Sequence, residues 1–182
     1  NKYKSSTRPD EAMSAYKADW QKTLDLTLPK LSGPFAKKMF KNYMNKRFIS
    51  ESGTIRDSTF VNFRNESRSL KLKQLDDISY RVANSQVGSK SHEMAIADKN
   101  AFFANSSNSD LFGDKFQKLK FDTDNNIDVL TITKHLSIDA LQTKINFDNG
   151  VYKGLDAETR IKIGNKITLA AQQKVLKNIE SD

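Results

Sequence analysis

The sequence predicts an all-α protein, an elongated multi-helix bundle with α-hairpins and about six to eight helices. Only 7 Gly and 3 Pro occur in 182 residues, which argues against a turn-rich β fold. Lys, Gln, Ala and Leu are frequent and favour helices. Apolar residues also recur with helical spacing along most of the chain.

The first expected helix runs from Pro9 to Leu28. Pro9 suits the first helical turn, and Asp10 and Glu11 would meet the positive end of the helix dipole. The following segment from Leu28 to Pro34 (LPKLSGP) is the clearest break in the chain.

A basic helix is expected to begin at Pro34 and to end at Ser52-Gly53. Its apolar side chains occupy one half-circle at 100° per residue: Phe35, Ala36, Met39, Phe40, Tyr43 and Met44. The candidate nucleic-acid-binding residues are the cations of this stretch: Lys37, Lys38, Lys41, Lys46 and Arg47. These cations indicate either an ordinary solvated face or a surface that meets nucleic acid or anionic lipid.

A long amphipathic pattern with mixed charges predicts a helix from Thr54 to about Ser85. After a Gly- and Ser-containing linker, helices are expected over 92–105, 111–120 and 127–136. The stretches 106–110 and 122–126 are polar and are expected to be a loop and a turn. We therefore expect a basic N-terminal part over 1–86 and C-terminal helical hairpins over 87–182, which could form one continuous domain.

The stretch from Ser137 to Glu180 predicts a short helix, a glycine-containing turn and a long helix. Ser137 could cap the short helix, Asp148-Asn149-Gly150 would end it, and Asp156 would cap the long helix. The long helix is amphipathic and carries the candidate assembly surface: Ile161, Ile167, Ala170, Ala171 and Val175.

The charge of the chain is segregated. Residues 1–56 carry 12 Lys or Arg against 5 Asp or Glu, whereas 57–123 carry 10 against 9 and 124–182 carry 8 against 8. Almost all of the formal net charge of +8 therefore lies in the first third. A localised basic surface favours a polyanionic partner.

Little in the sequence supports chemistry. The chain has no Cys and 2 His, so material for a metal centre is scarce. Val87 to Ser91 (VGSKS) lacks the first glycine of a phosphate-binding loop, and Asp122 to Asn126 (DTDNN) lacks the later ligands of a calcium loop. We expect no enzyme activity, no catalytic residue, no metal site and no cofactor. The chain begins with Asn1 rather than Met, so we also expect a processed protein or a fragment.

Short motifs carry a resemblance to a known family. Asp139-Ala140-Leu141 precedes a turn and then Leu155 to Arg160 (LDAETR), which opens the last long helix. Upstream, Trp20 is followed by Leu31 to Pro34 (LSGP) before a basic helix. In this order the chain resembles the internal virion and DNA-ejection proteins of short-tailed bacteriophages, over about half of its length.

The resemblance implies a structural protein of a phage particle, packaged inside the capsid and ejected into the host envelope as part of an internal core or conduit. The implied partners are copies of itself, portal or tail proteins, the double-stranded genome DNA and the host membrane. No small-molecule substrate is expected. Two alternatives remain, a helical nucleic-acid-binding module and a non-catalytic segment of a larger enzyme. Without the resemblance we would expect a cytoplasmic protein.

Overall fold

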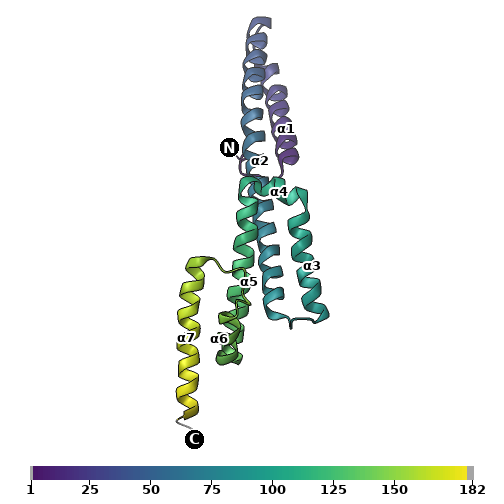
Figure 1. Ribbon diagram of the computed structural model, residues 1–182. Coiled ribbons are helices and arrows are strands. Elements are labelled where there is room, and N and C mark those ends of the chain that lie inside the picture. The colour runs from purple at the N-terminus through teal and green to yellow at the C-terminus, as the bar shows by residue number, and fades with distance from the viewer. Residues whose placement is uncertain (1, 180–182) are drawn as a thin grey trace. The chain divides into compact units, whose positions relative to one another are not determined.

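A computed structural model describes residues 2–179, and within this range the chain contains seven α-helices and two 3₁₀ helices but no strand (Figure 1). The prediction of an all-α protein built as a helical bundle is confirmed. The chain divides into two compact units, Asn1–Leu70 and Lys71–Asp182. The division falls inside the second helix, so the last part of that helix belongs to the C-terminal unit rather than to the N-terminal one.

The N-terminal unit is an antiparallel pair formed by α1 (Pro9–Thr27) and the first part of α2 (Pro34–Asn84). The 3₁₀ helix η1 (Leu28–Lys30) and Gly33, whose φ is +81°, make the turn between them. Only glycine adopts such a backbone conformation without strain. One core cluster of this unit contains three buried side chains with three half-buried ones around them: Ala12, Tyr16, Ile55, Tyr3, Met13 and Phe48.

The expected helix end at Ser52-Gly53 is wrong, because α2 continues without interruption from Pro34 to Asn84. Ser52 satisfies its hydroxyl inside the helix by donating to the carbonyl of Phe48. Ile55 and Thr59 follow directly and are fully buried. Their burial stabilises a helical backbone on the C-terminal side of the glycine, and this outweighs its weak helix propensity.

The C-terminal unit consists of the end of α2 and five further α-helices. These helices are α3 (Lys90–Ala104), α4 (Ser106–Phe112), α5 (Phe116–Ile138), α6 (Ala140–Asp148) and α7 (Ala157–Ile179), with the 3₁₀ helix η2 (Gly113–Lys115) before α5. One core cluster joins α2 to α3, α4 and α5 around Ile78 and Phe102. A second cluster joins α5, α7 and the segment between α6 and α7 around Ile132 and Ile167.

Two polar stretches of this unit are helical, contrary to the predicted loop at 106–110 and turn at 122–126. Asn105 caps α4 by accepting the backbone N–H of Ser107 at 2.9 Å, and the buried Asn108 donates to the Phe102 carbonyl. Within α5 the buried Thr123 donates its hydroxyl to the Leu119 carbonyl at 2.7 Å. Polar side chains that bond to nearby backbone in this way fit inside helices as well as in turns.

The helices expected over 92–105 and 127–136 are confirmed as α3 and part of α5. The C-terminal hairpin is confirmed with one change, since Asp139 rather than Ser137 caps α6 by accepting the N–H of Gln142 at 2.9 Å. Asp156 caps α7 by accepting the N–H of Thr159 at 2.7 Å. Caps of this kind satisfy backbone donors that have no partner within the helix.

Candidate functional site

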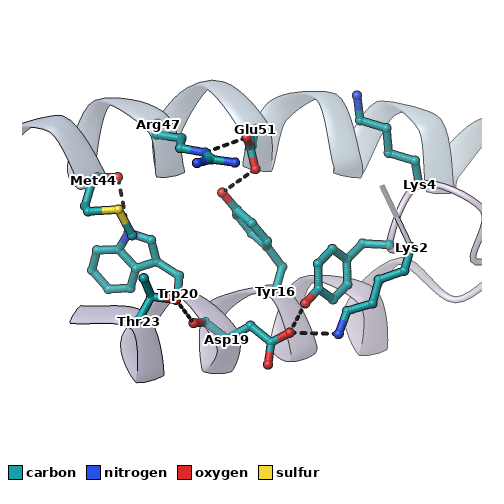
Figure 2. A pocket seen from close by; sticks show the side chains of 10 residues that line it. Lys2, Lys4, Tyr16, Asp19, Trp20, Thr23, Met44, Arg47 and Glu51 are labelled. Atoms are coloured by element: carbon teal, nitrogen blue, oxygen red, sulfur yellow. Dashed lines mark hydrogen bonds and ion pairs between the residues drawn. The ribbon is translucent and has the colours of Figure 1, made fainter. Parts of the chain in front are cut away.

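The largest cleft described in the N-terminal unit lies between α1 and α2 and has a volume of about 660 Å³ (Figure 2). It combines aromatic and charged side chains from three segments: Lys2, Tyr3, Lys4, Tyr16, Asp19, Trp20, Thr23, Met44, Arg47 and Glu51. We call it the N-terminal cleft. Arg47 is the one residue of the predicted nucleic-acid-binding set that lines it.

Asp19 holds the N-terminal segment against α1. Its carboxylate accepts a hydrogen bond from the ammonium of Lys2 at 2.8 Å (Figure 2). It also accepts a hydrogen bond from the hydroxyl of Tyr3. The hydrogen bond from Lys2, followed by that from Tyr3, lowers the pKa of Asp19. Asn62 of α2 adds a second attachment by donating to the carbonyl of Lys4 at 2.8 Å. The first residues of the chain therefore form one wall of the cleft.

Hydrogen bonds across the cleft join the two helices. The hydroxyl of Tyr16 in α1 donates a hydrogen bond to the Glu51 carboxylate at 3.0 Å, and the same carboxylate accepts a hydrogen bond from the Arg47 guanidinium at 2.8 Å (Figure 2). Burial is the main reason why the pKa of Tyr16 is raised to about 12, whereas the ion pair with Arg47 lowers the pKa of Glu51. Trp20 donates its indole N–H to the carbonyl of Met44 at 3.2 Å.

The charged state of the cleft follows from these contacts. The two carboxylates are ionised and paired at neutral pH, and Tyr16 keeps its proton. None of these three groups exchanges a proton near pH 7, which general acid or base catalysis would require. Their arrangement aligns α1 with α2 and fixes which sides of α2 remain exposed.

The remaining predicted nucleic-acid-binding residues, Lys37, Lys38, Lys41 and Lys46, are all exposed on α2. No ion pair involves them within the described range 2–179. At 100° per residue, the first three lie within an arc of about 100°, while Lys46 points to the opposite side from Lys37. Lys37, Lys38 and Lys41 therefore lie close together along α2, Lys46 lies about 80° from Lys38 and about two turns further along the helix, and Arg47 is paired with Glu51.

The apolar half-circle predicted for the same helix divides into two parts. Ala36, Phe40 and Met44 are buried or half-buried, as expected for a stripe that faces the core. Phe35, Met39 and Tyr43 are exposed instead. The spacing of these residues could not separate the two groups, because only the position of α1 determines which half it covers.

The predicted assembly residues also fall into two groups. Ile167 and Ala171 are buried inside the C-terminal unit and Ala170 is half-buried, whereas Ile161 and Val175 are exposed. Further exposed apolar residues of α7 that sequence reasoning did not include are Leu169, Leu176 and Ile179. An open apolar groove of about 560 Å³ lies between α6 and α7, and Val175 and Leu176 line it.

Neither a metal-binding group nor a membrane-spanning helix is found among the residues that the structure describes. Among residues 2–179, no group of three or more His, Asp or Glu side chains is placed to hold a metal ion. Over the same part of the chain, none of the helices has the length and apolar character needed to cross a bilayer.

Comparisons with protein-family models, with curated proteins and with solved structures gave no match to this chain.

Proposed function

We propose that this chain is a non-enzymatic helical structural protein that assembles with copies of itself and contacts double-stranded DNA through α2. Both activities are expected of an internal core or ejection-conduit protein of a phage particle, the family that the sequence resembles. The observation that carries the DNA contact is the group formed by Lys37, Lys38 and Lys41, three exposed and closely spaced cations without ion-pair partners in the described range.

The surroundings of these lysines support this proposal. No acidic residue occurs between Pro34 and Glu51, so no nearby carboxylate neutralises the three ammonium groups. Lys37 and Lys41 are separated by about one helical turn, about 6 Å along the helix axis, so both ammonium groups can approach the same phosphate backbone. Ammonium groups that approach phosphates release condensed counterions, and this release makes the affinity strongly dependent on salt.

The salt dependence of duplex affinity tests the DNA contact. We expect the variant Lys37→Gln/Lys38→Gln/Lys41→Gln to bind more weakly and to lower the slope of log K against log salt by up to about 3. The matched control is Lys120→Gln/Lys166→Gln/Lys174→Gln, which removes the same charge from exposed lysines of the C-terminal unit. If both variants change the slope equally, the contact depends on net charge and the assignment to α2 is wrong.

Exposed apolar residues on α7 support the self-assembly part of the proposal. Ile161, Leu169, Leu176 and Ile179 are all exposed on one helix, a concentration of apolar surface that is typical of a contact with another chain. Buried Ile167 contributes to the internal core and not to such a contact.

Sedimentation velocity over a range of concentrations tests the assembly. We expect the wild-type protein to form larger species as its concentration rises, and Leu169→Ser/Leu176→Ser to reduce this tendency. The control Phe121→Ser changes a similarly exposed residue of α5. A wild-type protein that remains monomeric at high concentration contradicts the assembly proposal.

A further inference from the structure

A second surface of α2, which meets the lysine group of the proposed DNA contact only at Lys38, carries four large apolar side chains. Phe35 is 76% exposed, Met39 55%, Tyr43 58% and Ile49 73%. At 100° per residue these four lie within an arc of about 120°. The centre of this arc is opposite Met44 and Ile55, which are buried against α1. We call this surface the outer face of α2.

Cations accompany the apolar residues. Lys46 lies within the same arc and Lys38 at its edge, and both are exposed. The N-terminal unit as a whole contains 14 Lys or Arg against 7 Asp or Glu. The outer face is therefore apolar and basic together, on a helix whose opposite side is already occupied by α1.

These properties distinguish between the occupants of the outer face. The same face of a second copy would bring two units of formal charge +7 together, which the charge repulsion disfavours. A DNA duplex would satisfy the lysines, but it would leave Phe35 and Ile49 without an apolar environment. An anionic bilayer surface offers acyl chains for the apolar residues and negative headgroups for the lysines.

We propose that the outer face of α2 binds an anionic lipid bilayer, with α2 lying in the plane of the interface. Phe35, Met39, Tyr43 and Ile49 insert among the headgroups and upper acyl chains, which is the depth that amphipathic helices reach. The long stem of Lys46 stays among the apolar side chains while its ammonium extends to the lipid phosphates. Lys37 and Lys41 lie outside this arc, whereas Lys38 at its edge also belongs to the lysine group of the proposed DNA contact.

Flotation with lipid vesicles tests this surface. The probes are vesicles of phosphatidylcholine alone and of phosphatidylcholine mixed with phosphatidylglycerol, each at low and high salt. We expect the wild-type chain to float with the anionic vesicles at low salt, to lose much of this binding at high salt, and not to float with the neutral vesicles.

Two variants separate the apolar and charged contributions. Phe35→Ser/Ile49→Ser is expected to reduce partitioning into anionic vesicles by about tenfold or more. Lys46→Gln is expected to reduce it by about fivefold at low salt. The matched control is Val87→Ser/Ile138→Ser, since these residues of the C-terminal unit are 74% and 73% exposed. It should float like the wild type.

The following results would overturn the proposal. The first is a wild-type chain that binds neither kind of vesicle or binds both equally. The second is a Phe35→Ser/Ile49→Ser variant that floats as well as the wild type. A third contrary result is that Phe35→Ser/Ile49→Ser dissociates a wild-type dimer, which would identify a second copy as the occupant. Loss of duplex affinity in Phe35→Ser/Ile49→Ser would also overturn it, because the outer face would then belong to the DNA contact.

Discussion

Gly154 packs so closely against α5 that no side chain fits at this position. A Cβ added there would lie 2.6 Å from the backbone carbonyl oxygen of Asp124, which is shorter than real Cβ contacts. The backbone of α5 or of the loop must move to accept it. We expect Gly154→Ala to lower the free energy of unfolding by about 1–3 kcal/mol in urea denaturation. A variant as stable as the wild type would show that this loop adapts freely.

Asp128 illustrates how one half-buried carboxylate couples stability to pH. It accepts the backbone N–H of Gly154 at 2.6 Å, but burial raises its pKa. The folded chain therefore holds this proton more tightly than the unfolded chain does. Ionisation of this carboxylate therefore lowers the free energy of unfolding, and this loss appears as the pH rises from about 4 through the folded-state pKa.

We expect Asp128→Asn to remove this penalty, because an amide oxygen can still accept the Gly154 N–H. The gain in stability over the wild type should be larger at pH 7 than at pH 4 in urea denaturation. Asp156→Asn is the control with the opposite sign. Hydrogen bonds from the N–H and hydroxyl of Thr159 lower the pKa of Asp156, so its contribution is present at neutral pH and is lost as the pH falls through the folded-state value. Equal pH trends for the two variants would contradict this assignment.

At the scale of the element, propensity and tertiary packing disagree most clearly in α2. Gly53 has helical backbone geometry in the middle of this helix, and no atom lies within 4 Å of a Cβ added there. We expect Gly53→Ala to raise the free energy of unfolding by about 1 kcal/mol, since alanine restricts the unfolded chain and favours the helix. Urea denaturation measures the change, and a loss of stability would show that the glycine serves α2 in another way.

The sequence predicted most helices correctly because their apolar spacing and their caps agree, as for Asp156 at the start of α7. It failed where local signals and tertiary contacts conflict. Gly53 and the stretch 122–126 both resemble helix ends, but buried neighbours such as Ile55 and Thr123 keep each helix continuous. Ile55 is buried against Ala12 and Tyr16 of α1, which are distant in the sequence, so no local pattern around Gly53 contains this contact.

The candidate surfaces were predictable only in part for a related reason. Composition identified α2 as the basic helix, and the exposure of Lys37 agrees with the spacing argument. The distinction between buried Met44 and exposed Met39 depends on where α1 lies against α2. For the same reason, the predicted assembly surface of α7 included both Ile167, which is buried, and Ile161, which is exposed. A helical pattern identifies an apolar side but not the neighbour that covers it.

At the scale of the whole molecule, charge and core size differ between the two units. Of the formal net charge of +8, a share of +7 belongs to residues 1–70. The core cluster of this unit contains three buried hydrophobic residues, whereas the two clusters of the C-terminal unit contain eight and four. The smaller core and the greater self-repulsion both make the N-terminal unit the less stable one.

We therefore expect the chain to unfold in two steps, with the N-terminal unit first. The single tryptophan, Trp20, packs against Phe48 in this unit, so its fluorescence reports the first step, whereas far-ultraviolet circular dichroism reports the helices of both units. The fluorescence midpoint should come at a lower urea concentration than the circular dichroism midpoint. Each part of α2 is stabilised by the core of its own unit, so the shared helix does not force a single transition.

Two core variants assign the two steps. Ile55 and Ile167 are both fully buried, the first in the N-terminal unit and the second in the C-terminal unit. Replacing either by alanine should cost about 2–5 kcal/mol in the unit that contains it. Ile55→Ala should shift the Trp20 transition and leave the second step in place, while Ile167→Ala should do the reverse. If the two probes coincide in the wild-type chain and both variants shift both signals, the units unfold together, and the core of one stabilises the whole protein through α2.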